Sequence, residues 1–524
     1  MQAHDVVVVG GGLAGLTSAA YLCRYGYRVL VCEKREKTGG LVETFHHQGF
    51  AFDAGIRAFE NSGILFPMLK DLGIDMDFVQ NPVTISIAGH RTVLDRTDGL
   101  ARYAAMLTAL FPDNAGDIVR IADEIRKVMG YMDVLYGIDN PLFLRDMPVS
   151  YLRKTLLPWL ARYQVNIRKA SRLNEPVGTY LQRLTPNGAL IDMITQHFFR
   201  DTPTFFALSY FGQYLDYCYP LGGTGELAVR MHRHILDAGG EIRTGTAVRR
   251  VDARKRQVVL ADGETIGYGK LVWAADQKAL YATASGLGSP AEIRQRKRTE
   301  AARGGDSILT LFVGSDQPPA AYADRCGAHA FHTPRTSGLS SLPGWEAAAG
   351  KGPEALLAWV GIYLEHTTYE ISCPVLQDPS LAPAGKTGLI LSTRMDYRLV
   401  RRLADAGMYE AFKDLCTEKI VEMLGHSLFP GFRQDILFTR CATPLTIERE
   451  TGNAEGAITG WAFTNAEMPA ENRFRKILRS CRTPIPDVLQ CGQWSFSPSG
   501  LPVSIVTGKV AADAVRKTLR PGRK

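Results

Sequence analysis

The sequence predicts an α/β fold at the amino-terminal end of the chain, and three observations point to it. Residues 5–9 form a short β-branched run of the kind that makes a buried parallel strand. A glycine-rich turn over 10–15 leads into a predicted helix over 13–25, which Gly26 would end. A second apolar run, 27–32, ends on Glu33. This order of elements is typical of a doubly wound, Rossmann-type unit.

The glycine-rich turn has the spacing G-x-G-x-x-G, which suits a dinucleotide diphosphate. Gly10 permits the tight turn, Gly12 lets the backbone approach the diphosphate, and Gly15 lets helix and strand pack closely. The diphosphate would lie on the first helical residues, Leu13 and Ala14, because free N–H groups and the helix dipole favour an anion there. We therefore expect a dinucleotide site at this turn.

The acid after the second strand narrows the choice of nucleotide. Glu33 follows Gly10 by 23 residues and is placed to accept hydrogen bonds from an adenosine ribose. A carboxylate there disfavours a 2′-phosphate, which leaves FAD and NAD. The next segment resembles the extended flavoprotein signature, in which a glycine pair follows the acid; it contains Lys34, Gly39, Gly40 and Leu41. In that signature the pair lies beside the FAD diphosphate and ribitol, so the predicted cofactor is FAD.

Further segments resemble the phytoene desaturase, carotenoid isomerase and retinol saturase branch of the flavin-containing amine oxidase superfamily. These segments are 49–55, 219–227, 238–251, 271–276, 443–453 and 489–503. The resemblance implies that 49–55 is a hairpin leading to a substrate domain. It also implies that the backbone at Val248 contacts the adenine.

The resemblance assigns the last of these segments to the flavin end of the cofactor. The residues concerned are Gly492, Gly500, Leu501, Pro502 and Val503. They lead into a predicted amphipathic helix that runs to about residue 516, and a proline suits its first turn because no N–H donor is needed there. In the family this helix points its amino terminus at the flavin pyrimidine edge, where its dipole would stabilise negative charge on reduced flavin.

Two positions depart from the family pattern near the expected flavin. Gln493 stands where many relatives carry an acid that can bind a ribitol hydroxyl. Ile-Arg-Ala at 56–58 stands where relatives tend to have Gly-Pro-Ser/Thr, which places Arg57 near the expected flavin face. Hydride transfer at a flavin needs no acid–base pair that the sequence displays, so we assign no catalytic side chain.

The motifs divide the chain into alternating segments. We expect 1–95, 216–305 and 476–524 to assemble one discontinuous FAD-binding domain. The segment 96–215 would form a helical lid and part of the substrate domain, and 306–475 a substrate-binding domain with a mixed sheet. Within the latter, 307–313 has the apolar run of a buried strand.

Composition argues against several other functions. The net charge of +8, from 61 Lys+Arg against 53 Asp+Glu, is mild for 524 residues, so nucleic-acid binding is not indicated. Nine cysteines without CxxC spacing disfavour a disulfide framework or a metal site. His329 and His332 have a metal-like spacing but fall in a predicted loop without a third ligand. We expect no metal.

Seven aromatic side chains stand close together just before the second predicted FAD segment. They are Phe205, Phe206, Tyr210, Phe211, Tyr214, Tyr217 and Tyr219. They form either the core of a domain interface or the wall of a long apolar tunnel, in which flat rings line a polyene well.

Together these features predict an FAD-dependent oxidoreductase that acts on a long apolar polyene or isoprenoid lipid. By resemblance to phytoene desaturase, hydride would pass to flavin N5. An isomerase or saturase that uses reduced FAD is the alternative, an amine oxidase is less favoured, and a non-enzymatic flavin-binding module least. The electron acceptor or donor stays open.

A basic and apolar stretch, 140–173, suggests where such a substrate would enter. Its basic residues are Arg145, Arg153, Lys154, Arg162, Arg168, Lys169 and Arg172. Leucines, Trp159 and tyrosines lie between them, and Pro148 and Pro158 are expected to break the stretch into short helices. One hypothesis is docking on an anionic membrane surface; the other is a basic lid helix packed on the FAD domain.

The start of the chain suggests a cytoplasmic location. The longest uncharged run, 6–23, is interrupted by four glycines, so it does not predict a membrane span. It also lacks a basic leader and a small-residue cleavage site. We therefore expect a cytoplasmic protein, associated peripherally with the inner face of a membrane.

Overall fold

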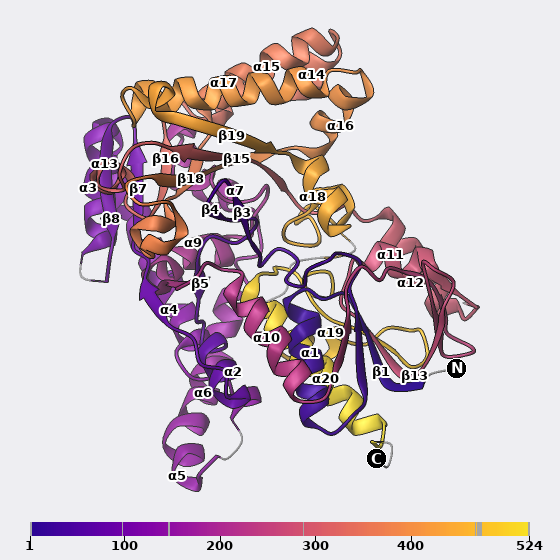
Figure 1. The fold of residues 1–524 in the computed structure, drawn as a ribbon. Helices are drawn as coiled ribbons and strands as arrows, with labels where there is room; N and C mark the ends of the chain where they lie inside the picture. The colour runs from indigo at the N-terminus through magenta and orange to yellow at the C-terminus, as the bar shows by residue number, and fades with distance from the viewer. Residues whose placement is uncertain are drawn as a thin grey trace.

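The computed structural model describes residues 3–96, 98–144, 147–286, 288–466, 468 and 474–521. These residues form two large sheets with helices on their faces, and an arm of helices extends from one side (Figure 1). The predicted fold class, a Rossmann-type α/β domain with a mixed-sheet substrate domain and a helical part, is confirmed.

The first sheet is assembled from three distant parts of the chain. Its strand order is β10–β2–β1–β13–β12–β11–β14, and β20 also pairs with β13. The strands are β1 (Ala3–Val9), β2 (Val29–Cys32), β10 (Glu241–Arg243), β11 (Val248–Asp252), β12 (Gln257–Leu260), β13 (Thr265–Trp273), β14 (Ala284–Ser285) and β20 (Val488–Gln490). Strands β10, β2, β1, β13 and β20 run parallel. They provide the carboxyl-terminal edge at which such sheets bind ligands.

The valines of β1 explain why this sheet is covered on both faces. Successive side chains of a strand point to opposite faces. Val6 and Val8 therefore join one apolar cluster with helices α1 (Leu13–Arg24), α10 (Glu226–Asp237) and α20 (Leu501–Thr518). Val7 and Val9 join a second cluster with α11 (Gln277–Thr283). All four valines are buried, as expected for a central parallel strand.

The second sheet has the order β19–β15–β18–β17–β16–β7–β8. Its strands are β7 (Val83–Ile87), β8 (His90–Leu94), β15 (Ser307–Ser315), β16 (His329–Thr333), β17 (Tyr369–Ser372), β18 (Thr387–Met395) and β19 (Ile436–Ala442). It is mixed, because β16 and β7 run parallel while the other pairs are antiparallel. The strand expected at 307–313 is present as β15. Strands β7 and β8 lie within the segment 1–95 but belong to this sheet, so that segment contributes to both sheets.

Helices α15 (Pro353–His366) and α17 (Tyr409–Ser427) cover the outer face of the second sheet (Figure 1). Their apolar side chains share a core cluster with the sheet residues Leu311, Leu389 and Ile371. Two smaller sheets are also present: the hairpin β3 (Thr44–His47) with β4 (Phe50–Asp53), and β5 (Phe59–Glu60) with β9 (Tyr217–Pro220) and β6 (Phe78–Gln80).

A buried aspartate at the end of the hairpin joins the amino-terminal segment to the segment after residue 216. The Asp53 side chain accepts hydrogen bonds from the Tyr219 hydroxyl at 2.6 Å, the Thr224 backbone N–H at 2.9 Å and the Thr44 hydroxyl at 2.7 Å. A buried carboxylate with several donors is fixed in one position. It therefore holds two segments that are far apart in sequence in one register.

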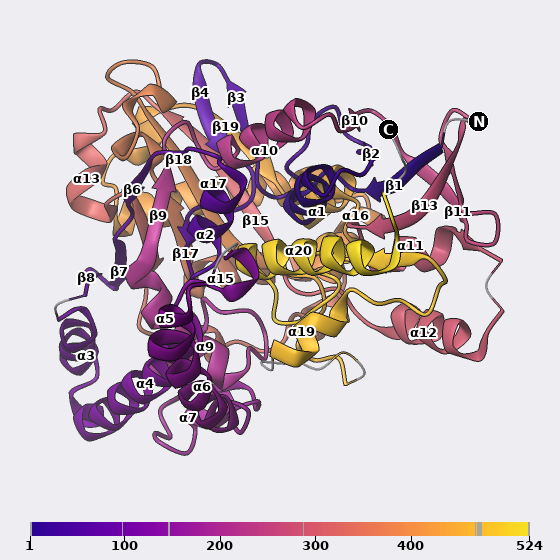
Figure 2. The ribbon, with the colours of Figure 1, turned by 90° about the horizontal axis from the view of Figure 1, so that it is seen from below.

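The helical arm contains α3 (Gly99–Leu110), α4 (Ala115–Tyr136), α6 (Leu157–Ala170) and α9 (Thr204–Gln213), with α5 (Val149–Tyr151) near its tip (Figures 1 and 2). The expected break at Pro158 is wrong. A π-helical turn over Leu152–Leu156 connects α5 to α6, so 149–170 runs as one helical stretch. Local changes of helix type of this kind accommodate a missing N–H. None of the helices in the described part of the chain combines the length and apolar character needed to cross a membrane.

The two helices nearest the glycine-rich turn, α1 and α20, lie side by side (Figure 2). A Cβ atom at Gly508 of α20 would stand only 2.5 Å from the Ala14 carbonyl oxygen of α1. The contact is between backbones, so no rotation of a side chain could relieve a larger residue there.

Gly508→Ala is therefore expected to lower the free energy of unfolding by roughly 1–3 kcal/mol, because it forces α1 and α20 apart. Chemical denaturation measures this change. Gly130→Ala is the matched control: a Cβ at this exposed position in α4 meets nothing within 4 Å, so it should stabilise the protein by about 0.5–1 kcal/mol. Equal stability of the two variants would contradict the close packing of α1 on α20.

Candidate active site

The glycine-rich turn between β1 and α1 has a backbone that only glycine can supply at two positions. Gly10 has φ +104°, in the region that favours glycine, and its N–H donates to the Cys32 carbonyl at 2.9 Å. A Cβ at Gly15 would lie 2.0 Å from the Gly10 carbonyl oxygen. Gly12 differs, because nothing lies within 4 Å of its Cβ position. Gly12 therefore borders open space in front of the amino terminus of α1.

Glu33 fixes the turn from the end of β2. Its carboxylate accepts hydrogen bonds from the backbone N–H of Gly11 at 2.6 Å and of Arg35 at 2.9 Å. Since Glu33 also lines the cavity described below, the same side chain organises the turn and faces the nucleotide position.

The amino terminus of α20 borders the same cavity. Gly500 precedes the helix and Pro502 stands in its first turn, without an N–H. The N–H groups of a first helical turn have no acceptor within the helix, so they are free to bind a ligand. The Thr507 hydroxyl of α20 accepts a hydrogen bond from the Gly492 N–H at 2.9 Å, which joins this helix to the end of β20.

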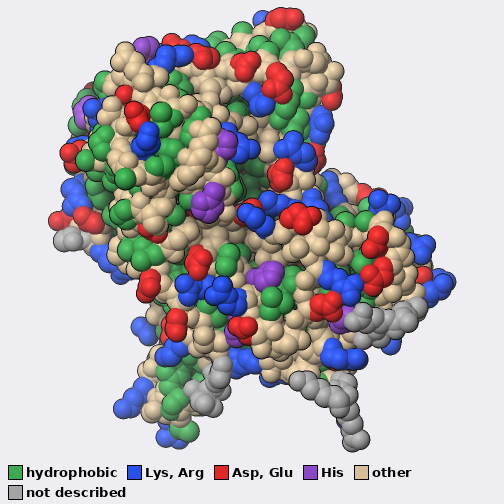
Figure 3. Space-filling model, viewed as in Figure 1, with side chains coloured by type: hydrophobic (Ala, Val, Ile, Leu, Met, Phe, Trp, Pro, Cys, Tyr) green, Lys and Arg blue, Asp and Glu red, His purple; other side chains and the backbone are tan. Residues whose placement is uncertain are grey.

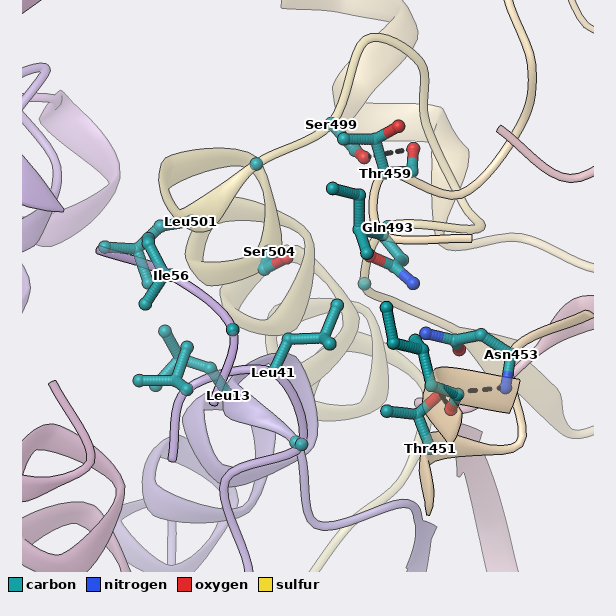
Figure 4. A pocket seen from close by; sticks show the side chains of 18 of the residues that line it. Leu13, Leu41, Ile56, Thr451, Asn453, Thr459, Gln493, Ser499, Leu501 and Ser504 are labelled. Atoms are coloured by element: carbon teal, nitrogen blue, oxygen red, sulfur yellow. Dashed lines mark hydrogen bonds between the residues drawn. The ribbon is translucent and has the colours of Figure 1, made fainter. Parts of the chain in front are cut away.

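A single cavity of about 520 Å³ connects these features. Figure 4 shows Leu13, Leu41, Ile56 and Leu501 on one side of it, facing Thr451, Asn453 and Gln493. Thirteen of the sequence-predicted cofactor residues line it: Gly10, Gly12, Leu13, Ala14, Glu33, Lys34, Gly39, Gly40, Leu41, Val248, Gly492, Gly500 and Leu501. Gly15, Pro502 and Val503 are not among the lining residues; Gly15 packs on the turn, and the other two belong to the first turn of α20.

The thirteen predicted cofactor residues form one part of the cavity lining, called here the cofactor strip, and aromatic side chains form another part. Phe206 and Tyr210 lie one turn apart on α9, with ring centroids 5.5 Å apart, and Tyr214 continues the row at 5.2 Å from Tyr210. Tyr217 on β9 follows at 5.6 Å from Tyr214. These four of the seven predicted aromatics line the cavity.

The other three predicted aromatics have structural positions. Phe205 and Phe211 are buried in apolar clusters, and Tyr219 donates to Asp53. The segment therefore divides between rings that line the cavity and rings that pack in the interior, and a tunnel for a polyene stays a prediction. The four-residue spacing of Phe206, Tyr210 and Tyr214 is the sequence signal that could have identified the rings lining the cavity, because residues four apart share a helix face.

Ionisable groups also line the cavity. Arg57 is buried, and its guanidinium donates to the carbonyls of Asp53 and Gly55 and to the Ser392 hydroxyl. His329 Nε2 lies 3.1 Å from Glu370 Oε1. Burial lowers the pKa of His197 to about 3 and raises the pKa of Glu60 to about 7.

Sequence reasoning missed most of these groups. Glu60, His197, Glu370 and Arg394 belong to no motif. The pairing of distant strands brings Glu60, Glu370 and Arg394 to the cavity, and His197 reaches it from the turn after α8 (Gly188–Thr195). The expected loop at 329–332 is wrong, because both histidines lie on β16. The ring nitrogens of His332 contact the hydroxyls of Ser86 and Ser427, and burial lowers its pKa to about 4.

The cavity suits a long dinucleotide cofactor. It is lined by the amino termini of two helices, α1 and α20, by open backbone at Gly12, and by the Glu33 carboxylate where β2 ends. A family model described as flavin containing amine oxidoreductase matches residues 13–516. The chain belongs to this family. It is an FAD-dependent oxidoreductase.

Individual relatives are distant but similar over most of their length. The chain is 24% identical over 533 residues to all-trans-retinol 13,14-reductase of Danio rerio, covering 93% of this chain and 83% of the reductase. It is 21% identical to the chloroplastic prolycopene isomerase of Daucus carota, with 86% and 71% covered. It is 25% identical to the lycopene-forming phytoene desaturase of Pseudescherichia vulneris, with 86% and 88% covered.

Solved structures share the fold. The oxidoreductase of Methanosarcina mazei superposes with a TM-score of 0.64 at 15% identity, covering 98% of this chain and all of that protein. The family and branch expected from the motifs are therefore confirmed, as are an enzyme activity and the FAD cofactor.

Gly12→Val is expected to leave the fold intact and abolish FAD binding, because the new side chain would occupy the open space that we assign to the diphosphate. The measurement is the flavin absorbance of purified protein after reconstitution, together with the thermal unfolding of the apoprotein. Gly15→Ala is the contrasting variant: its Cβ would meet the Gly10 carbonyl, so it should destabilise the apoprotein itself. A Gly12→Val protein that retains FAD would overturn our placement of the diphosphate.

Proposed function

We propose that this flavoenzyme acts on a long apolar polyene or isoprenoid lipid, with desaturation as the preferred direction. The observation that carries the proposal is the row of rings from Phe206 to Tyr217, which extends the cofactor cavity with an aromatic wall. Flat rings contact a conjugated chain over a large area and present few polar groups. The retinoid and carotenoid relatives support the same substrate class.

The parts of the site divide the work of such a reaction. Bound FAD supplies the hydride chemistry. The cofactor would be held by the cavity-lining residues between Gly10 and Leu41 and by Val248, Gly492, Gly500 and Leu501. The aromatic wall would orient the substrate and exclude water. The amino terminus of α20 would stabilise negative charge at the flavin end of the cavity.

Isomerisation or saturation of the same class of lipid is the second candidate. Two of the relatives are a prolycopene isomerase and a retinol reductase, so an isomerase or saturase that works from reduced FAD fits the same cavity. An amine oxidase is less favoured, because those relatives act on lipids rather than on cationic amines.

Anaerobic mixing of oxidised holoenzyme with a panel of carotenoid, retinoid and other isoprenoid lipids should bleach the flavin with one polyene substrate and give a product two hydrogens poorer. Absorbance and product mass are followed together. A product of unchanged mass with a new double-bond geometry would indicate the isomerase instead. Faster flavin reduction by small polar amines than by any lipid would overturn the lipid proposal.

We also propose that the tip of the helical arm docks on an anionic membrane surface, from which such a substrate would enter. The tip carries exposed apolar side chains, among them Val149, Leu157 and Leu160, and the described part of 147–173 contains six basic residues and no acid. Figure 3 shows hydrophobic and basic side chains together on this projection. The seventh basic residue of the prediction, Arg145, lies outside the described residues.

The structure changes which residues should bind lipid. The Trp159 indole N–H donates to the Val134 carbonyl of α4, so this ring anchors the arm rather than facing outward. Leu157 and Leu160, in contrast, are 59% and 40% exposed. Anionic lipid headgroups would attract each nearby Lys or Arg by about 1 kcal/mol.

Leu157→Glu/Leu160→Glu is expected to lose co-sedimentation with anionic vesicles while keeping its FAD, because it places two carboxylates where apolar side chains would enter the interface. Binding of the wild type should weaken as salt rises. Val229→Glu/Leu236→Glu on α10 adds the same charge at two exposed apolar positions away from the arm and should bind as wild type does. Equal loss in both variants would point to net charge, and loss in neither would place docking elsewhere.

A further inference from the structure

Among the groups that line the cavity, one buried carboxyl has no assigned partner. Glu60 ends the short strand β5, is 9% exposed and borders the cavity. Within the described part of the chain, no Lys or Arg nitrogen lies within 4.0 Å of its carboxylate. It accepts a hydrogen bond from its own backbone N–H. A buried carboxyl without a cationic partner is costly to ionise, so its protonation state responds to a ligand that enters the cavity.

Its position is at the flavin end and beside the aromatic row. A Cβ at Gly500, immediately before α20, would lie 3.9 Å from Glu60 Oε1. On its other side Glu60 pairs across the strands with Tyr217, so the two side chains share a face of this small sheet. The carboxyl is therefore located where the cofactor part and the aromatic part of the cavity meet.

The other carboxylates of the cavity are already engaged. Glu33 and Asp276 accept hydrogen bonds from backbone N–H groups, and Glu370 contacts His329 at 3.1 Å. The buried His197 is a poor base, since burial lowers its pKa to about 3. Glu60 is left as the carboxyl that can change its protonation state without breaking a contact that holds the site.

We propose that Glu60 is the proton-transferring residue of this active site, an inference that rests on the proposed polyene substrate. In desaturation, one substrate carbon loses hydride, with its electron pair, to FAD. On the adjacent carbon the C–H bond breaks, its electron pair becomes the new C=C bond, and the proton passes to a Glu60 carboxylate oxygen. In the saturating direction, the protonated Glu60 returns that proton.

Burial supports this role, because it raises the pKa of Glu60 to about 7. The carboxyl is then protonated below about pH 7, as a donor requires, and ionised above it, as an acceptor requires. The titratable neighbours on β9 stay neutral over this range: burial raises the pKa of Cys218 to about 12 and that of Tyr217 well above its ordinary value. On the α20 side, β5 contacts the helix, and its first turn, 501–504, carries no titratable side chain.

The test compares Glu60→Gln with the wild type as reconstituted holoenzymes. Glutamine keeps the size of the side chain, so FAD content and KM should be unchanged while kcat falls roughly 10²–10⁴-fold. In the desaturating direction the wild-type kcat should rise through about pH 7, and the variant should lose this step.

A measurement independent of turnover is the infrared carbonyl band of a protonated carboxylic acid. It should be present below about pH 7 and vanish above it in the wild type, and be absent from Glu60→Gln. Glu292→Gln is the matched control: Glu292 is similarly buried, but it caps α12 (Pro290–Ala301) away from the cavity, so kcat, its pH profile and the band should stay as in the wild type.

The outcomes separate this inference from the proposed function. If the wild type converts a polyene and Glu60→Gln does so at the same rate and with the same pH profile, Glu60 has no proton-transfer role while the function stands. If Glu60→Gln slows turnover but no titrating band is lost, Glu60 acts by position and the inference is again wrong. If the wild type converts no polyene, both fail together.

Discussion

The site depends on the close approach of three backbones at the amino-terminal turn. The Gly10 carbonyl occupies the space that a side chain at Gly15 would need, and the Ala14 carbonyl the space that a side chain at Gly508 would need. Helix α1 is thereby held against both the end of β1 and the flank of α20. Since the first turns of α1 and α20 both line the cavity, this packing fixes the position of one helix amino terminus relative to the other. A shift of either helix would change the shape of the site.

A second constraint connects the cofactor strip to the small sheet β5–β9–β6 and to the second large sheet. Asp53 fixes the hairpin β3–β4 to the segment that begins at β9. Strand β9 pairs with β5 and so places Glu60 and Tyr217 side by side. Arg57, between Asp53 and Glu60 in sequence, extends to Ser392 on β18. The short run 53–60, which contains the departure from the family pattern at 56–58, therefore connects the hairpin, the small sheet and the second large sheet.

The sequence predicted the parts of the site that local chemistry determines. The glycine spacing, the acid after β2 and the proline in α20 each reflect a requirement of backbone geometry or of an anion, so they could be recognised without the fold. Glu60, His197 and Glu370 could not, because each is an ordinary residue locally and becomes part of the site only through tertiary contacts: strand pairing for Glu60 and Glu370, and the position of the turn after α8 for His197. The helix at 149–170 illustrates another limit: Pro158 predicts a break, but a π-helical turn absorbs its missing N–H.

The mixed character of the cavity constrains the chemistry it can perform. A wall that only held a hydrocarbon would be most stable if it were entirely apolar. Burying Arg57, Glu60, His197 and Glu370 carries a desolvation free energy that aromatic packing does not offset. The aromatic residues occupy one stretch of the wall, from Phe206 to Tyr217. Glu60 and His329 lie beside Tyr217, and His197 lies beside Tyr214. Substrate binding and proton transfer are then assigned to different parts of one cavity. Under the proposed function, the aromatic region would position the substrate chain, and the ionisable groups would lie near the carbons that react.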